Sequence, residues 1–321
     1  MRGWPWNPLA SVRVLDGGLA TELEFLGADL SGPLWSAHVL ERQPELVARV
    51  HRAYLEAGAE CIATASYQVS RRGYAELGLK AARADRALLR AVEIAVGERD
   101  AAEAGGGRRA LVAASLGPLG AALHNGAEYH GNYDCGFDEL VRFHRERIEV
   151  LTAGADLPTA DLLAFETIPS LDEARAIVAA LANAPEVSVW ISFTCRDGEH
   201  VAHGERLRDC VAAVAAAPQV AGVGVNCVPP GRVTALLGEL RAGVDLAARC
   251  EPSAGREMAL LAYPNSGEAW DAEARRWTGV TDAGEFGVMA GEWFAAGAQM
   301  VGGCCRTRPE HVRAIAAAAR Q

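Results

Sequence analysis

The 321-residue sequence predicts an α/β fold, a (β/α)8 or TIM barrel with its active site at the C-terminal ends of the strands. Short apolar runs rich in Val, Ile, Leu and Ala recur along the chain, and a helical pattern fills each interval between them. Several runs are almost continuously apolar, as in parallel strands covered on both faces. The alternative is a doubly wound open sheet, although no GxGxxG dinucleotide motif is present. A single domain over residues 1–321 is expected, with residues 1–11 as an N-terminal extension.

The expected strands are apolar and end at polar residues or turn formers. They lie near residues 12–16, 61–67, 110–116, 161–166, 188–194, 222–227, 258–263 and 298–304.

The expected helices show apolar residues at intervals of three and four. The clearest covers residues 44–57, and a glycine follows it directly. The others are expected at 75–96, 137–152, 171–182, 207–216, 233–242 and 283–296. A last helix is expected to begin behind Thr307 as its N-cap, with Pro309 in its first turn, and to run to Arg320.

Composition and charge exclude some classes of function. The net charge of −10 gives no basic surface for nucleic acid or for an anionic membrane. The longest Ala-rich stretch, residues 211–225, is interrupted by Pro218 and by glycines, which predicts a helix, a loop and a strand rather than a membrane span. The N-terminal residues do not have the pattern of a signal peptide. With eight cysteines, we therefore expect reduced thiols and a cytoplasmic location.

A barrel places its functional side chains at the carboxyl ends of the strands and in the loops behind them. Polar and sulfur-bearing residues of this chain lie at those places: Asp16-Gly17-Gly18, Ser66-Tyr67-Gln68, Glu166-Thr167, Cys227, Tyr263-Pro264-Asn265 and Cys304-Cys305. Two loops, residues 117–136 and 265–281, are long enough to cover such a site. Simple surface variation is the alternative explanation for their length.

The cysteines are the most informative of these residues. Side chains of neighbouring strand residues point to opposite faces, so Cys304 and Cys305 can serve one site only where the chain leaves the strand. The two glycines before them permit that departure. Cys227 ends another apolar run, just before two prolines. Three thiolates with an open fourth position suit a catalytic zinc ion. Packing of buried thiols, or a disulfide between the neighbours, are the alternatives.

Two carboxylates stand at strand ends. Asp16 could hold a ligand or simply shape the turn before the glycines. Glu166 follows Leu-Leu-Ala-Phe, where an unpaired carboxylate is costly, so we expect it to meet a cation. That cation is either a substrate ammonium or an internal arginine.

As a set, these motifs resemble the homocysteine S-methyltransferase family over residues 12 to 318. The matching segments are residues 15–23, 164–169, 224–227, 263–268 and 302–307. Residues 126–129 with 131–133, and residues 192–198, resemble the branch of that family that uses S-methylmethionine as donor.

The resemblance implies zinc-dependent transfer of a methyl group from a sulfonium donor, S-methylmethionine or to a lesser degree S-adenosylmethionine, to homocysteine, giving methionine. The zinc ligands map onto Cys227, Cys304 and Cys305. Asp16 and Glu166 map onto residues that hold the substrate ammonium, and the backbone N–H groups around Gly17 and Gly18 are placed for its carboxylate.

No catalytic residue beyond the zinc site is expected, because the transferred methyl group has no proton to remove. His124 and His130 are therefore expected to pack in loops or at the surface. The other cysteines, Cys61, Cys135, Cys195, Cys210 and Cys250, are expected to be packing or surface thiols, with Cys195 nearest the mouth of the barrel.

Several alternatives stay open at this point. The acceptor could be selenocysteine or another small thiol, and the donor could be betaine. A non-catalytic protein with structural zinc would need a fourth ligand. An NAD- or phosphate-using barrel lacks a suitable glycine-rich loop, and a barrel that uses the whole chain leaves no room for a cobalamin or folate module.

Overall fold

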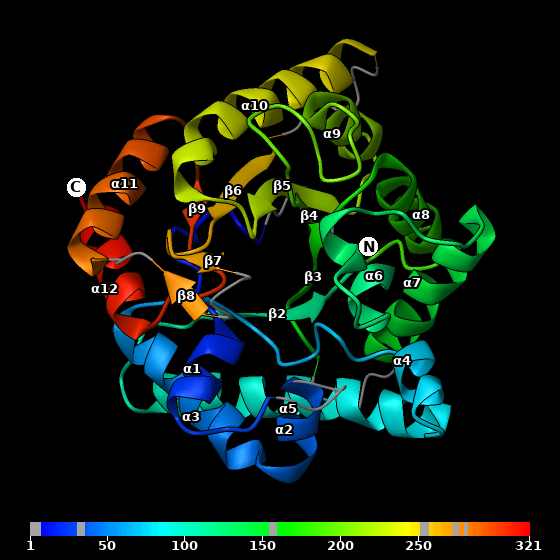
Figure 1. The fold of residues 1–321 in the computed structure, drawn as a ribbon. Helices are drawn as coiled ribbons and strands as arrows, with labels where there is room; N and C mark the ends of the chain where they lie inside the picture. The colour runs from blue at the N-terminus through cyan, green and yellow to red at the C-terminus, as the bar shows by residue number, and fades with distance from the viewer. Residues whose placement is uncertain (1–7, 31–35, 154–158, 251–256, 272–275, 279–281) are drawn as a thin grey trace.

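The computed structural model describes residues 8–30, 36–153, 159–250, 257–271, 276–278 and 282–321. Seven parallel strands form one curled sheet in the order β1-β2-β3-β4-β5-β6-β9. Their bounds are β1 Cys61–Ala63, β2 Leu111–Leu116, β3 Leu162–Ile168, β4 Val189–Phe193, β5 Val220–Asn226, β6 Ala259–Tyr263 and β9 Met300–Val301. The strands stand around a common centre, and the helices surround them (Figure 1).

The long helices alternate with the strands, as the sequence pattern predicts. The helices are α1 Leu19–Phe25, α2 Ser36–Arg42, α3 Pro44–Ala57, α4 Arg71–Glu76, α5 Ala81–Ala104, α6 Leu119–Ala122, α7 Phe137–Thr152, α8 Leu171–Leu181, α9 Leu207–Ala215, α10 Val233–Cys250, α11 Ala283–Ala295 and α12 Pro309–Ala318, with 3-10 turns η1 Ala127–Tyr129 and η2 Pro230–Arg232. An antiparallel pair, β7 Ala269–Asp271 and β8 Arg276–Thr278, lies in the second long loop; residues 272–275 and 279–281 of that loop are outside the described residues.

The first expected strand, residues 12–16, is not a regular strand. It makes two isolated parallel bridges instead, from Val14 to Val301 and from Leu15 to Cys61. The Leu15 N–H donates to the Val301 carbonyl at 2.9 Å, and the Asp16 N–H donates to the Cys61 carbonyl at 3.1 Å. This segment therefore lies between the two end strands of the sheet, β9 and β1.

Other predicted boundaries were also wrong. The strand expected at 61–67 spans only Cys61–Ala63, and the helix expected at 233–242 continues to Cys250. The strand expected at 298–304 spans only Met300–Val301, because Gly302 and the residues behind it turn toward other segments. The helix expected at 75–96 is two helices, α4 and α5, because Gly78 adopts a φ of 71° and breaks the first. The N-cap of α12 is Arg308, and Thr307 binds the chain near Gly18 instead.

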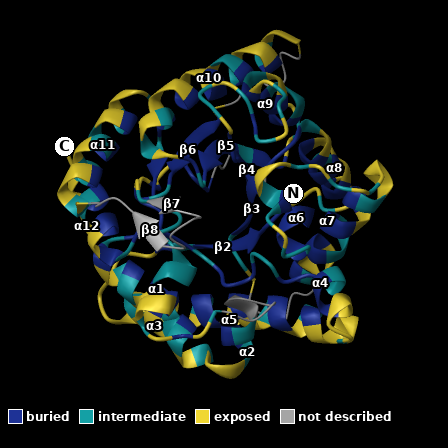
Figure 2. Ribbon diagram, viewed as in Figure 1, coloured by how far each residue is buried: buried dark blue, intermediate teal, exposed yellow. Residues whose placement is uncertain are grey.

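The apolar side chains form two layers on opposite faces of the sheet. Alternate residues of a strand face opposite sides, so neighbours such as Ala113 and Ala114 of β2 belong to different clusters. The larger cluster lies between the sheet and the helices. The smaller one lies on the concave face and contains Leu9, Val12, Leu15, Cys61, Ala113, Leu162, Ala164, Trp190, Ala259, Leu261, Tyr263 and Met300. Figure 2 shows the buried strands inside and the exposed helix faces outside.

Part of the N-terminal extension belongs to this inner layer. Leu9 is 1% exposed, and it packs close to Gly222 of β5. This packing was not expected, because residues 1–11 carry no periodic pattern.

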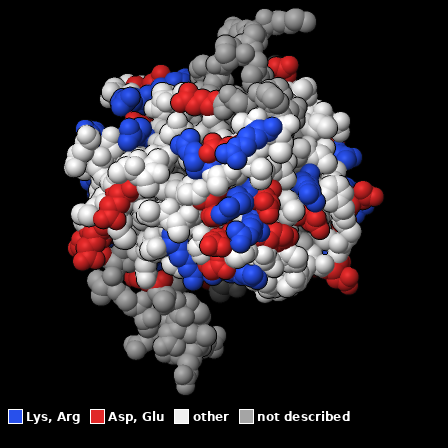
Figure 3. Space-filling view, turned by 90° about the horizontal axis from the view of Figure 1, so that it is seen from above, with Lys and Arg blue, Asp and Glu red and all other residues white. Residues whose placement is uncertain are grey.

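The charged residues do not separate by sign on the face seen in Figure 3, where both kinds are interspersed. Among the helices that the structure describes, none is long and apolar enough to cross a membrane.

Candidate active site

The three cysteines singled out in the sequence meet in space. The Sγ atom of Cys227 lies 2.9 Å from that of Cys304 and 3.6 Å from that of Cys305. All three sulfurs lie within 4.8 Å of one another. Cys227 directly follows β5, and the pair follows β9, so the cluster joins two strand ends separated by β6.

The backbone leaves the sheet at these cysteines, as expected. Cys227 has a φ of 53°, a left-handed conformation that a side chain disfavours. The Cys304 N–H donates to the Pro264 carbonyl at 2.8 Å, and the Cys305 N–H donates to Asn265 Oδ1 at 3.2 Å. The loop after β6 therefore holds the cysteine pair in place.

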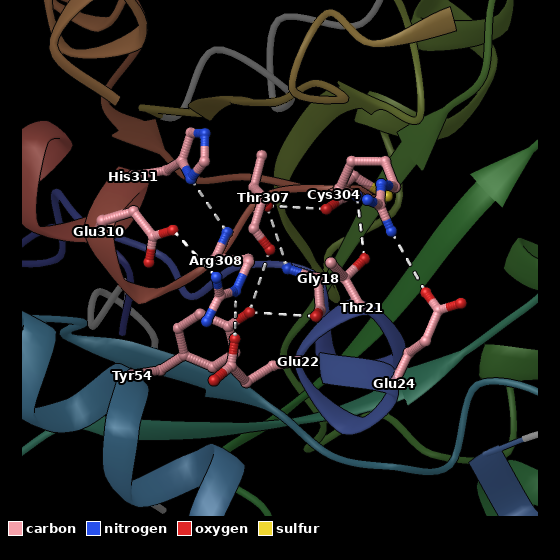
Figure 4. Close-up of polar contacts among 11 residues, drawn as sticks. Gly18, Thr21, Glu22, Glu24, Tyr54, Cys304, Thr307, Arg308, Glu310 and His311 are labelled. Atoms are coloured by element: carbon pink, nitrogen blue, oxygen red, sulfur yellow. Dashed lines mark hydrogen bonds and ion pairs between the residues drawn. The ribbon is translucent and has the colours of Figure 1, made fainter. Parts of the chain in front are cut away.

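A second set of contacts joins the pair to the Asp16–Gly18 turn (Figure 4). The Gly18 N–H donates to the Thr307 hydroxyl at 3.1 Å, and that hydroxyl donates to the Cys304 carbonyl at 2.7 Å. The Tyr54 hydroxyl donates to the Gly18 carbonyl at 3.0 Å. A Cβ on Gly18 would collide with the Cys304 carbonyl. Gly18 is thus needed for the close approach of the two loops, and its N–H is already bound.

A polar network supports the cluster from behind. Asn226 accepts from the Thr167 N–H at 2.8 Å and from the Ser192 hydroxyl at 2.9 Å, and its own NH2 donates to the Thr167 hydroxyl at 2.8 Å. The same NH2 lies 3.9 Å from Cys304 Sγ. Ser192 also contacts the Tyr263 hydroxyl. Asn226 and Ser192 have no role among the expectations above; their position near strand ends was the available signal.

The two predicted carboxylates lie in the interior. Asp16 is 8% exposed, and its Oδ2 accepts from the Ala63 N–H at 2.8 Å. Burial raises the pKa of Asp16 well above its ordinary value. Burial also raises the pKa of Glu166 to about 7. Within the described part of the chain, no Lys, Arg or His lies within ion-pair distance of Glu166, so the internal arginine partner considered above is not found.

One cavity of about 1420 Å³ connects these groups. Asp16, Glu166 and the three cysteines all line it. Its wall also includes Gly17, Gly18, Tyr67, Gln68, His124, Glu128, Tyr129, Trp190, Asn226, Tyr263 and Arg306. A volume of this size accommodates two amino-acid-sized molecules at once.

The thiol cluster has the chemistry of a metal site. Hydrogen bonds from the thiols of Cys227 and Cys304 lower the pKa of Cys305 well below its ordinary value, whereas the pKa values of Cys227 and Cys304 are raised by hydrogen bonds within the cluster and by burial. Sulfurs about 2.3 Å from a tetrahedral zinc ion would lie roughly 3.8 Å apart. The Cys227–Cys305 spacing of 3.6 Å is close to this value, and the Cys227–Cys304 spacing of 2.9 Å is shorter. Over the residues that the structure describes, no fourth His, Cys, Asp or Glu completes the group. The set therefore fits a metal held on three sides, with the fourth side open.

The first long loop reaches this site. Tyr129 of η1 places its hydroxyl 4.0 Å from Cys227 Sγ. His124 lines the same cavity, and burial lowers its pKa.

The remaining cysteines are not part of the cluster. Cys195 is buried, and burial raises the pKa of its thiol; the nearby Cys210 raises that pKa further. The eight cysteines are free thiols in the structure, and Cys250 is exposed.

Comparisons with known proteins agree with this geometry. The family model for homocysteine S-methyltransferase matches residues 13–319. Homocysteine S-methyltransferase YbgG of Bacillus subtilis is 42% identical, and the match covers 96% of this chain and 94% of that protein. Homocysteine S-methyltransferase 1 of Zea mays is 41% identical, with 94% and 92% covered. The crystal structure of the homocysteine methyltransferase MmuM from Escherichia coli in a metallated form superimposes with a TM-score of 0.80 at 40% identity, covering 95% of this chain and 96% of that one.

Proposed function

The chain belongs to the homocysteine S-methyltransferase family and transfers a methyl group to homocysteine, and from this premise we propose the metal, the donor and the residues that it uses. The metal is Zn²⁺, held by Cys227, Cys304 and Cys305. The donor is a sulfonium compound, S-methylmethionine, with S-adenosylmethionine as a lesser one. The product is methionine.

One observation carries this proposal. Three sulfurs from distant parts of the chain lie within 4.8 Å of one another on the wall of a cavity that also contains two buried carboxylates. Thiolate sulfur is a preferred ligand of zinc, and three protein ligands with an open position are typical of catalytic sites. A structural zinc site would need a fourth protein ligand. That the related MmuM has been crystallised in a metallated form supports a metal here as well.

Asp16 and Glu166 are the proposed contacts of the homocysteine ammonium. Both are buried in the cavity wall, and a cation beside them would offset the cost of their burial. The substrate carboxylate is placed near the N–H of Gly17. Gly18 contributes differently from the sequence expectation, because its own N–H donates to Thr307. Its role is to let the Asp16–Gly18 turn approach Cys304.

The methyl transfer itself requires no further acid, base or nucleophile from the other side chains. When bound, the zinc ion favours loss of the homocysteine thiol proton, so that the sulfur reacts as a thiolate. The sulfur then gives an electron pair to the methyl carbon while the donor's carbon–sulfur bond breaks and its electrons remain on the donor sulfur. With S-methylmethionine, both products are methionine, and the thiol proton passes to solvent. The protein's contribution is to hold the two sulfurs in line with the methyl carbon, with the homocysteine sulfur about 3–3.5 Å from that carbon before the transfer.

We also propose that the whole fold is a closed (β/α)8 barrel in a single domain. The bridges of Val14 and Leu15 to both end strands support this, as does the alternation of these two residues between the outer and inner apolar layers. Free thiols suit a cytoplasmic protein, and that location stays a prediction.

The test compares wild type with Cys304→Ser. We expect the variant to lose bound zinc and to lose methionine formation from homocysteine together, because a hydroxyl is a far poorer zinc ligand than a thiolate. Cys250→Ser is the matched control, since this thiol is exposed and outside the cavity. Both donors are assayed in parallel. Undiminished turnover by a zinc-free Cys304→Ser protein would overturn the mechanism.

A second measurement separates a catalytic zinc from a structural one. X-ray absorption at the zinc edge is recorded before and after addition of homocysteine. A new sulfur neighbour supports the enzyme, whereas an unchanged ligand set with four protein donors would support the structural role.

A further inference from the structure

The cavity contains two buried acceptor atoms that the proposed homocysteine site does not use. Glu128 Oε2 and Gln68 Oε1 are both buried, and neither has a hydrogen-bond partner within the described chain. Both residues line the cavity. A buried acceptor without a donor is costly, most of all for a carboxylate, so these atoms are expected to meet a ligand with N–H groups.

Local packing holds Glu128 in this position. It belongs to η1, whose backbone presses so closely on Gly120 of α6 that a Cβ on that glycine would collide with it. The Asn125 side chain accepts from the Ala127 N–H at 3.0 Å, and Gly126 turns the chain with a φ of 79°. The carboxylate is therefore presented by a constrained turn.

Glu128 also lies on the sulfur side of the cavity. It is close enough to Cys305 for the two groups to interact electrostatically, and burial is the main cause that raises the pKa of Glu128. The Tyr67 hydroxyl is close enough to both Cys227 and Glu128 to interact with them electrostatically. Tyr129, which follows Glu128 in η1, places its hydroxyl 4.0 Å from Cys227 Sγ. Two tyrosines thus lie near both this carboxylate and the cluster.

We propose that Glu128, assisted by Gln68, binds the ammonium group of the methyl donor. This inference rests on the proposed function, in which two amino-acid substrates occupy the cavity together. Asp16 and Glu166 account for one ammonium, and the second needs its own acceptors. The tyrosines beside Glu128 place aromatic rings where a sulfonium cation would pass, a favourable contact for a positive charge.

This assignment makes the donor's amino group a specificity determinant. A sulfonium carboxylate without an amino group, such as dimethylsulfoniopropionate, cannot use Glu128 in this way. The residue should therefore matter for S-methylmethionine and not for that compound.

The experiment uses Glu128→Gln, which keeps the shape of the side chain and removes its charge. We expect the KM for S-methylmethionine, and its Kd measured by calorimetry without homocysteine, to rise by roughly 10- to 100-fold, with kcat changed much less. The KM for homocysteine should stay within about twofold. For dimethylsulfoniopropionate, the constant measured is a KM, or an inhibition constant against S-methylmethionine. Its value for Glu128→Gln should also stay within about twofold of the wild-type value.

The matched control is Glu24→Gln, which removes another carboxylate from the wall of the same cavity. The Glu24 carboxylate already forms an ion pair, with its Oε2 atom 3.2 Å from Arg306 Nη1. The donor constants of this variant should be unchanged. Gln68→Leu is a second, independent variant and should weaken S-methylmethionine binding by roughly 2- to 10-fold; it decides the matter if Glu128→Gln does not fold.

Failure of this inference differs from failure of the proposed function. If wild type makes no methionine from any sulfonium donor, the proposed function is wrong. If wild type is active but Glu128→Gln weakens both donors equally, or neither, then Glu128 does not bind the donor ammonium.

Discussion

Four residues with side chains on the cavity wall adopt left-handed backbone conformations: His124, Thr167, Cys227 and Arg306, with φ values of 53°, 60°, 53° and 65°. The last three lie just where a strand or the cysteine pair ends. Such conformations cost roughly 1–3 kcal/mol each and persist only when the surroundings enforce them. Asn226 does so for Thr167, because it binds both the N–H and the hydroxyl of that residue. Local strain at Thr167 is therefore offset by a buried network that also faces Cys304.

Glu166 should make stability depend on pH. Its pKa is raised from 4.5 to about 7, so between these values the folded protein keeps a proton that the unfolded chain has lost. The free energy of unfolding of the ligand-free protein should therefore fall as the pH rises from about 4.5 to 7, by up to about 3 kcal/mol from this residue.

Glu166→Gln should remove that part of the slope, and the variant should gain stability relative to wild type as the pH rises. Urea unfolding at several pH values from about 4.5 to 8 measures this. Parallel profiles for the two proteins would show that Glu166 is not the group responsible.

On the scale of elements, one buried network holds the first long loop against the body of the protein. Glu173 of α8 accepts from the Leu119 N–H at 2.6 Å, from the Tyr133 hydroxyl at 2.9 Å and from His144 Nε2 at 3.0 Å. Arg147 donates to the other ring nitrogen of His144 at 2.8 Å and to the Gly117 carbonyl at 2.9 Å. The loop that carries Glu128 and Tyr129 is thus tied at both ends to helices α7 and α8.

The network also explains the charge state of its histidine. Burial lowers the pKa of His144 to about 4, so the ring is neutral at pH 7. The Arg147 contact requires an acceptor at Nδ1, which places the proton on Nε2, facing Glu173. Both ring nitrogens of His144 then have a matching partner.

Glu173→Ala should break this attachment. We expect a loss of about 3–5 kcal/mol in the free energy of unfolding, because donors buried around the carboxylate lose their acceptor. Hydrogen exchange should accelerate across residues 117–136. Ser170→Ala is the control: it removes the N-cap of α8 at a cost of about 1 kcal/mol and leaves the loop contacts intact. Equal exchange in the loop of both variants would contradict this role.

For the molecule as a whole, the inner apolar layer determines how deep the cavity is. Trp190 and Tyr263 belong to that layer and also line the cavity, so they form its floor. The Trp190 N–H donates to the Tyr263 hydroxyl at 3.1 Å, which satisfies both polar groups where they are buried. Leu9 packs into the same layer and brings the N-terminal segment into the fold.

Leu9→Ala should therefore destabilise the protein although it lies outside every predicted element. We expect a loss of about 2–4 kcal/mol in the free energy of unfolding, because a fully buried leucine is replaced by a cavity. Chemical denaturation measures it. Val288→Ala, at a site that is 67% exposed, should cost less than about 1 kcal/mol. A Leu9 variant as stable as the Val288 variant would show that the N-terminal segment is dispensable.

The sequence by itself determined the alternation of strands and helices and the residues that gather at the site. Periodicity, which is a local signal, sets the type of each element. Once the topology follows from the order of the elements, the residues at the carboxyl ends of the parallel strands are known to meet. Cys227, Cys304 and Cys305 could be brought together on this argument, and so could Asp16 and Glu166.

Only the tertiary structure decided the rest. The Gly18 N–H donates to Thr307, and Glu173 accepts from the Leu119 N–H, 54 residues away in the sequence. Leu9 fills the inner layer. All of these contacts join residues that are far apart in the chain. Such contacts have no local pattern, because a buried group is satisfied by whichever partner the packing brings to it. The two unpartnered acceptors beside the sulfur cluster became visible for the same reason: only a folded chain shows which buried groups still lack a partner.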